Sequence, residues 1–394
     1  MGVVRSHSLS IGIVGLPNAG KSSLFNSLTK NLVPAENFPF TTIDKNVGVV
    51  VVPDKRLESL NTFFSANKKV PSAITFVDIA GLVKGASKGE GLGNQFLSHI
   101  REVDVILYVL RAFKSENIVH VYNRVSPFED LAIVQSELIL KDVETIEKKL
   151  GELKKNSRSG MTPELSLGIG VLERAMEWMG EGKMVVNMPM NDEEKAFMQE
   201  LWLLSNKKGM YLLNIREGMD EVEREEWVMA FKEQLPQEDR DYVVQGDVKM
   251  IGELSDMNED EKAEYIALLD KTPVMMEDII ATAYKRLNLV TFYTGSEKEV
   301  NAWTVEAGAS ARDAAGVIHT DLAKGFITAE VVNVNRMLEL GGWNKAKEAG
   351  AVKNVGKEYV IQDGDYMIVT QIRNYLDSTS ISNHFLIQSY RLWY

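Results

Sequence analysis

A glycine-rich octapeptide near the start of the chain has the residue types and spacing of a phosphate-binding loop. It reads Gly15-Leu-Pro-Asn-Ala-Gly-Lys-Ser22, the Walker A pattern of a glycine, four residues, and then glycine, lysine and serine. Its glycines let backbone N–H groups wrap phosphates, and the dipole of a following helix favours negative charge. Lys21 would reach the β- and γ-phosphates, and the Ser22 hydroxyl would bind Mg²⁺. The predicted nucleotide-binding residues of this loop are Asn18, Ala19, Gly20, Lys21, Ser22 and Ser23.

Two further segments follow in the order that a nucleotide-dependent switch requires. Thr42 lies in a polar loop interrupted by proline, where its hydroxyl would be a second protein ligand of Mg²⁺. Asp78 ends an apolar run, and Gly81 follows three residues later. The Asp78 carboxylate would hold the Mg²⁺ shell, and the Gly81 N–H would sense the γ-phosphate. Together with Lys21, Asp78 and Gly81 are the predicted catalytic residues.

The Walker A loop needs a strand before it and a helix after it, and the sequence supplies both. Residues 10–15 are an apolar run that predicts a buried strand, and residues 21–29 carry Leu24, Phe25 and Leu28 on one side of a helix. Further strands are predicted at residues 47–52, 73–77, 104–110 and 209–214. Strands that alternate with helical stretches predict an α/β fold with a mostly parallel sheet.

The segment between the last two of these strands has helical periodicity instead. Apolar residues from Leu131 to Leu153 recur at spacings of three and four, which predicts a long amphipathic helix. Gly160 and Pro163 interrupt the pattern before it resumes, and Asn191-Asp-Glu-Glu194 predicts the capped start of another helix. We predict an antiparallel helical arm at residues 129–208. Basic residues gather near its tip: Lys148, Lys149, Lys154, Lys155 and Arg158. They indicate either a solvated tip or a contact for RNA phosphate or an acidic partner.

The last part of the chain changes to a β-rich pattern. Strands are predicted at residues 290–293, 303–305, 326–334, 359–362 and 366–371, with one helix over 309–318. The sequence thus predicts an α/β domain at residues 8–287, interrupted by the arm, a β-rich domain at 288–373 and a C-terminal tail at 374–394.

Composition excludes several classes of protein. A chain of 394 residues with 45% hydrophobic and 25% charged residues is typical of globular proteins, not of disordered or collagen-like ones. The absence of cysteine excludes disulfides, thiolate metal sites and cysteine nucleophiles. Without a long apolar run or a signal-peptide pattern, we expect a soluble cytoplasmic protein with no membrane partner. The net charge of -12 excludes a chain-wide basic patch, so any RNA contact must be local.

The residues of these motifs resemble those of a known family. The Walker A loop and Phe38–Asp44 resemble the Obg group of translation-factor-class GTPases, and Asp78–Ile100 narrows the resemblance to the YchF subfamily of Obg-like ATPases. Ala315–Asp321 and Gly325–Glu330 resemble this family near the C-terminus. The resemblance implies a P-loop G domain, an inserted antiparallel coiled-coil arm and a C-terminal TGS domain of the β-grasp type. It also implies Mg²⁺-dependent ATP hydrolysis and action on the large ribosomal subunit or RNA through the TGS domain and the arm, in translation or the stress response.

The predicted base-reading segment differs from that of GTPases, whose Asn-Lys-x-Asp sequence hydrogen-bonds guanine. Asn214 keeps the amide, but Ile215 replaces the lysine and Glu217 replaces the aspartate. A carboxylate longer by one methylene cannot pair with guanine in the same pose, so guanine preference is expected to be relaxed or lost. The resemblance implies that ATP is preferred over GTP, with these three residues beside the base. The sequence does not establish whether residues near Gln245–Asp247 form the last loop that contacts the base.

Hydrolysis is expected to be slow. Leu82 stands where Ras-like enzymes carry the glutamine that orients water, and a hydrocarbon cannot do this. Pro17 leaves little room for an arginine finger, and a resemblance to cation-assisted GTPases implies that Asn18 helps to bind K⁺ there. The resemblance implies a histidine where this chain has Tyr108, so the sequence does not identify the group that orients the attacking water.

Four functions fit the nucleotide loop. The first is a switch on ribosomes that hydrolyses ATP slowly. The others are a GTP-preferring Obg-type GTPase, a P-loop kinase for a small molecule, and an adaptor that binds nucleotide only for stability. A kinase needs a lid with arginines over the phosphates, and the helical insert has few. Phosphate release from ATP without an acceptor separates hydrolysis from transfer and from simple binding.

Overall fold

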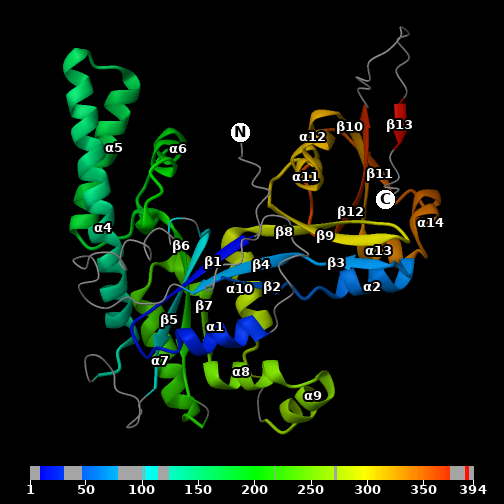
Figure 1. Cartoon of the computed structure of the whole chain (residues 1–394), viewed down its shortest axis with the longest axis horizontal. Coiled ribbons are helices and arrows are strands. Elements are labelled where there is room, and N and C mark those ends of the chain that lie inside the picture. Colours follow the sequence, from blue (N-terminus) through cyan, green and yellow to red (C-terminus); the bar gives the residue numbers. More distant parts are fainter. Residues whose placement is uncertain are drawn as a thin grey trace. The chain divides into compact units, whose positions relative to one another are not determined.

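The computed structural model describes residues 9–30, 47–78, 101, 103–113, 124–216, 218–269, 273–372 and 387–389. Contacts divide these residues into two compact units. The α/β unit takes its residues from 9–50 and 74–286, and the β-rich unit from 51–73 and 287–394. Figure 1 labels the elements of both.

The α/β unit is built on a six-stranded sheet in the order β2-β4-β1-β5-β6-β7. Its strands are β1 (Leu9–Val14), β2 (Val47–Val51), β4 (Ala73–Asp78), β5 (Val105–Arg111), β6 (Lys208–Asn214) and β7 (Val243–Gly246). The pairings that link β4, β1, β5, β6 and β7 are all parallel. The expected strands of this region are confirmed to within a residue at each end. Because the strands are parallel, the ends of β4, β6 and β7 lie at the same edge as the loop that follows β1.

Helices complete this unit. They are α1 (Lys21–Lys30), α7 (Glu221–Gln234), α8 (Val248–Asp256), α9 (Glu259–Ala267) and α10 (Met276–Leu287). Leu24 and Leu28 of α1 are buried, as their spacing predicts. Gly252 lets α8 approach α1 closely, because a Cβ atom there would lie 2.5 Å from the Ser27 Oγ. None of the helices in the described ranges combines the length and apolarity of a membrane span.

The predicted antiparallel arm is confirmed. It consists of α4 (Pro127–Asn156) and α5 (Pro163–Gly180), which lie side by side in Figure 1, followed by the shorter α6 (Asp192–Gln199). Thr162 caps α5 by accepting a hydrogen bond from the Leu165 N–H, and Asn191 and Glu194 form the expected capping box of α6. The apolar stripes of α4 and α5 pack in one core with β5 and β6.

A buried carboxylate fixes the root of the arm. Asp142 of α4 is fully buried and accepts hydrogen bonds from the backbone N–H groups of Leu204 at 3.0 Å and Ser205 at 2.6 Å. Its Oδ2 also accepts from the Ser205 hydroxyl at 2.5 Å. Burial raises the pKa of the Asp142 carboxyl above its ordinary value, and the hydrogen bonds from Ser205 and Leu204 offset part of this. Asp142 thereby ties α4 to the turn that leads into β6.

The β-rich unit has a seven-stranded sheet in the order β11-β10-β12-β8-β9-β3, with β13 paired to β12. Its strands are β3 (Lys68–Val70), β8 (Leu289–Gly295), β9 (Glu299–Glu306), β10 (Phe326–Asn333), β11 (Lys353–Val355), β12 (Asp365–Ile372) and β13 (Ile387–Ser389). Its helices are α2 (Lys55–Phe64), α11 (Ala311–Ile318), α12 (Thr320–Lys324), α13 (Val334–Glu339) and α14 (Trp343–Glu348). One core contains α11, and a second contains α2, α13 and α14.

The expected β-rich character and the helix over 309–318 are confirmed, but the strand expected at 359–362 is wrong. In that segment only Val360 forms an isolated bridge, to Ser310. The segment instead bonds to the short stretch before α11, because the Ala311 N–H donates to the Tyr359 oxygen and the Ile361 N–H donates to the Ala309 oxygen. The Asp365 carboxylate also accepts hydrogen bonds from the Gln362 N–H and the Tyr359 hydroxyl.

The two-unit division differs from the expected domains at residues 51–73, which the sequence placed in the α/β domain. In the structure, Leu57 and Leu60 of α2 are buried in a core of the β-rich unit. Strand β3 pairs in parallel with β9. Burial of the apolar face of α2 and the backbone pairing of β3 explain why this segment joins the C-terminal sheet.

We expect Asp142→Ala to lower the free energy of unfolding by about 1–3 kcal/mol, because two N–H groups and a hydroxyl would lose their buried acceptor. Urea denaturation followed by circular dichroism measures this loss. Glu147→Ala, an exposed change on the same helix, is the matched control. A loss no larger than that of the control would show that this carboxylate does not hold the arm.

Candidate nucleotide-binding site

The loop between β1 and α1 is pressed against the ends of β5 and β6. A Cβ atom on Gly15 would lie 2.3 Å from the backbone oxygen of Val109. Gly20 has a φ of +107°, and a Cβ atom there would lie 2.5 Å from the Asn214 Nδ2. Both glycines of the Walker A pattern are therefore required by close approach of neighbouring atoms.

Lys21 is the first residue of α1, and its side chain turns back over the loop. It is 9% exposed, and its Nζ donates a hydrogen bond to the backbone oxygen of Leu16 at 2.9 Å. The ammonium is therefore held beside backbone atoms of the loop, at the positive end of the α1 dipole. A phosphate group in the loop would be attracted both by the Lys21 ammonium and by the N-terminal end of the α1 dipole.

The other predicted residues of the loop fall into two groups. Asn18, Ser22 and Ser23 are exposed, whereas Ala19 is buried. The Ser22 hydroxyl is available at the start of α1, and the described residues contain no cluster of three or more acidic or histidine side chains that could hold a metal ion. An exposed hydroxyl of this kind fits Mg²⁺ in a P-loop protein, where the ion takes most of its ligands from phosphate and water.

Asn214 connects the loop to a second helix. Its side chain is almost fully buried, and its Nδ2 donates to the backbone oxygen of Ala19 at 2.8 Å. Its Oδ1 accepts from the backbone N–H of Val248, the first residue of α8, at 3.2 Å. The amide predicted to read the base therefore also fixes the loop, and one of its two N–H donors is used in doing so.

Residues 245–247, the loop that the sequence left open, lie next to Asn214. Gly246 pairs with Asn214 in the register of β6 and β7, and its backbone oxygen accepts from the Ile215 N–H at 3.1 Å. The Asp247 carboxylate caps α8 by accepting from the N–H groups of Lys249 and Met250. The signal that could have found this position is an aspartate at the start of a helix, which is a preferred N-cap.

Of the predicted switch residues, the structure describes only the backbone of Asp78. Asp78 ends β4, where the backbone register pairs it with Ile13 of β1. This places its backbone at the same edge of the sheet as the loop. Thr42, Gly81, Leu82 and Glu217 lie outside the described residues.

Tyr108 is a core residue of β5. It is 1% exposed, and its ring stacks on that of Tyr211 with 5.5 Å between the centroids. Burial, and next the nearby Asp239 carboxylate, raise the pKa of Tyr108 well above its ordinary value. A phenol that stays protonated cannot serve as a general base at neutral pH.

Arg111 is held inside the unit. Its guanidinium is buried, donates from Nε to the backbone oxygen of Phe113 at 3.0 Å and lies 4.7 Å from the Phe113 ring centroid. Burial lowers the pKa of Arg111, and the Asp130 carboxylate opposes this. These contacts give Arg111 a structural role at the end of β5.

A parallel sheet whose first strand leads through this glycine-rich loop into a helix defines a P-loop nucleotide-binding domain. Residues 10–149 match a family model described as a 50S ribosome-binding GTPase. Residues 289–371 match the YchF-GTPase_C model, described as a protein of unknown function (DUF933). The chain belongs to the YchF family.

Relatives match along nearly the whole chain. The ribosome-binding ATPase YchF of Bacillus subtilis is 41% identical, over 91% of this chain and 98% of that protein. The protein of the same name from Escherichia coli O157:H7 is 40% identical, over 90% and 97%. The solved structure of the Schizosaccharomyces pombe YchF GTPase is 35% identical, with a TM-score of 0.79 over 92% of this chain and 97% of that one. The expected fold class and family are confirmed.

We expect Gly20→Ala to weaken nucleotide binding about tenfold or more, which corresponds to about 1.4 kcal/mol. The added Cβ would displace the Asn214 amide or strain the loop, at a cost of about 1–3 kcal/mol. Fluorescent-nucleotide titration measures the affinity. Gly170→Ala is the matched control, since a Cβ there meets no atom within 4 Å. Equal affinities in the two variants would contradict the close approach at Gly20.

Proposed function

We propose that this protein is a nucleotide-operated switch that binds ATP with Mg²⁺ and hydrolyses it slowly. The observation that carries the proposal is the Walker A loop, whose buried Lys21 lies at the start of α1. Its Nζ donates to the neutral backbone oxygen of Leu16, and hydrogen bonds between charged groups are roughly twice as strong as neutral ones. Phosphate would therefore draw the ammonium away from Leu16.

The remaining roles follow from position along the chain. Ser22 and Thr42 would supply hydroxyl ligands to Mg²⁺, which when bound neutralises charge on the phosphate oxygens. Asp78 would orient the Mg²⁺ shell, and the Gly81 N–H would sense the γ-phosphate. Leu82 cannot orient water, and the buried Tyr108 cannot take its proton, so hydrolysis by these residues alone is slow.

Preference for adenine is supported by the backbone of Ile215. Its N–H is used by the Gly246 oxygen, whereas its own carbonyl accepts no hydrogen bond among the described residues. This carbonyl would accept from the amino group of adenine but would face an oxygen on guanine. Together with Asn214 and with Glu217 in place of an aspartate, this favours ATP over GTP.

The names of the relatives do not agree on whether ATP or GTP is the nucleotide. The bacterial relatives are called ATPases, and the Schizosaccharomyces pombe protein is called a GTPase. A GTP-preferring enzyme is therefore the second candidate. We further propose that Asn18, exposed beside the phosphate position, helps K⁺ to promote hydrolysis. A higher rate in K⁺ than in Na⁺ buffer is the expected result.

The partner that we propose is the ribosome, with its large subunit or RNA contacted through the arm and the β-rich domain, which we assign as a TGS domain. The bacterial relatives are named for ribosome binding, and the tip of the arm presents exposed basic side chains. These are Lys148, Lys154, Lys155 and Arg158. A cytoplasmic location and a role in translation or the stress response are consistent with this partner.

We expect Lys21→Ala to reduce ATP turnover about 100-fold or more, the usual effect of removing a donor that stabilises transition-state charge. Phosphate release from ATP, with no acceptor present, measures turnover. Lys249→Ala, which removes an exposed lysine of α8, is the matched control and is expected to keep parental turnover. Turnover that is unchanged in Lys21→Ala would reject the site.

The double variant Ile215→Lys/Glu217→Asp is expected to shift preference toward GTP. The shorter carboxylate can approach the N1–H and amino group of guanine, and a bidentate reader is worth about 1–3 kcal/mol. That corresponds to a change of about 5- to 150-fold in the ratio of the ATP and GTP dissociation constants. Titrations with both nucleotides measure the ratio, and Glu225→Asp on α7 is the control. A ratio that stays constant would mean that residues 214–217 do not face the base.

A further inference from the structure

A groove lies on the arm, between α5 and the residues that lead into α6. Its volume is about 340 Å³, at the lower end of the range of about 300–1,000 Å³ for ligand pockets. The residues that line it are Arg174, Glu177, Trp178, Glu181, Met188 and Pro189. The first four belong to α5 and its C-cap at spacings of three and four, so they lie on one face of the helix.

The indole of Trp178 forms an aromatic wall of this groove and is held in one position. Its Nε1 donates a hydrogen bond to the backbone oxygen of Met184 at 3.0 Å. Met188, which also lines the groove, is 6% exposed and packs in the core of the unit. The apolar part of the groove is therefore preformed, and a ligand would spend little binding energy on ordering it.

A lysine of the same chain already uses this indole as a cation site. The Lys183 Nζ lies 4.6 Å from the centroid of the Trp178 ring and pairs with the Glu181 carboxylate. The ring attracts the ammonium because the face of an aromatic ring carries negative charge. Lys183 is absent from the lining of the groove, so the groove reaches the indole on a side that Lys183 does not occupy.

The charges along the groove favour a second cation. Arg174 is already bonded, because it donates from Nη1 to the Glu194 Oε1 at 2.5 Å and from Nη2 to the backbone oxygen of Pro189 at 2.6 Å. The Glu177 carboxylate is exposed and has no ion pair or hydrogen bond with any residue that the structure describes. Glu177 therefore adds a negative charge to the groove that no described cation balances.

A guanidinium matches these features better than other charged groups. It is planar, stacks on aromatic rings and donates in a fork that fits a carboxylate, whereas an ammonium is a compact point charge. A phosphate group would be repelled by Glu177 and Glu181, which line the groove. The groove therefore selects an arginine side chain and disfavours RNA.

We propose that this groove binds an arginine side chain of a partner protein, with the guanidinium against Trp178 and hydrogen-bonded to Glu177. The arm then has two contact surfaces of opposite character, a basic tip for phosphate and this groove for a basic protein segment. The inference goes beyond the proposed function and does not depend on nucleotide binding.

A fluorescently labelled nona-arginine peptide tests the groove, with nona-lysine as the comparison. Fluorescence anisotropy gives the dissociation constants at about 0.15 M salt, where charges attract one another only over about 8 Å. We expect the parent protein to bind nona-arginine more tightly than nona-lysine. Trp178→Leu and Glu177→Gln are each expected to weaken nona-arginine binding about threefold or more, the lower range for a cation on an aromatic ring.

Each variant has a matched control outside the groove. Trp202→Leu removes an exposed indole that also lies beside a lysine, since the Lys207 Nζ is 5.4 Å from its ring centroid. Glu164→Gln removes an exposed carboxylate from the first turn of α5. Both controls are expected to keep the parental affinity. Because Glu177 is exposed, Glu177→Gln tests the groove even if Trp178→Leu does not fold.

The remaining outcomes would overturn the inference. Equal affinities of the parent protein for the two peptides would do so, as would equal losses in the groove variants and their controls. Binding of a labelled oligouridylate that is lost in Trp178→Leu and Glu177→Gln would assign the groove to RNA instead. ATP turnover is measured on the same proteins, and a parent without turnover would reject the proposed function but not this inference.

Discussion

The Asn214 side chain joins three separate parts of the α/β unit through two hydrogen bonds. It ends β6, holds the backbone oxygen of Ala19 in the phosphate loop and accepts from the first N–H of α8. The loop can come this close only because residue 20 is glycine. Since α8 also packs against α1 at Gly252, and Gly15 lies against the Val109 backbone of β5, the loop is held at both of its ends. A preformed loop spends little binding energy on ordering itself around phosphate.

Strand β6 relates the arm to this site. Asp142 of α4 fixes the turn before the strand, and Asn214 ends it. All residues between Gly209 and Asn214 are buried, and Tyr211 is stacked against Tyr108 of the neighbouring strand. Because packed interiors deform little, a displacement of the arm root would be transmitted along β6 toward Asn214.

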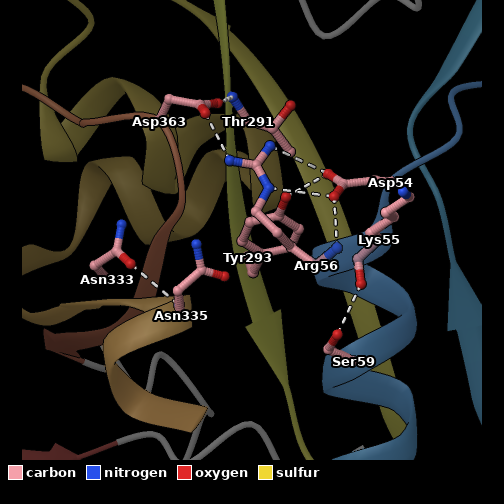
Figure 2. Close-up of polar contacts among 9 residues, drawn as sticks. All are labelled: Asp54, Lys55, Arg56, Ser59, Thr291, Tyr293, Asn333, Asn335 and Asp363. Carbon is pink, nitrogen blue, oxygen red and sulfur yellow. Dashed lines mark hydrogen bonds and ion pairs between the residues drawn. The ribbon is translucent and has the colours of Figure 1, made fainter. Parts of the chain in front are cut away.

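The β-rich unit is formed by segments distant in sequence. Its sheet includes β3, and its second core includes α2, and both lie in residues 51–73 between β2 and β4. Arg56 joins Asp54, just before α2, to Asp363, just before β12, through side-chain hydrogen bonds (Figure 2). A C-terminal domain built in this way is connected to the rest of the chain at several points instead of one.

Local patterns in the sequence determined the parts of this protein that depend on neighbouring residues. Periodicity predicted the parallel strands and the arm, and the Walker A spacing predicted the loop, because these signals need only a few consecutive turns or residues. The strand expected at 359–362 did not form because the residues that this segment bonds to, 309–311, lead directly into helix α11. Tertiary structure alone decided that residues 51–73 join the C-terminal sheet, that Asn214 bridges to Val248, and that Asp142 receives three hydrogen bonds. Each of these depends on long-range partners, and nothing in the local sequence around Arg56 specifies a carboxylate at Asp363.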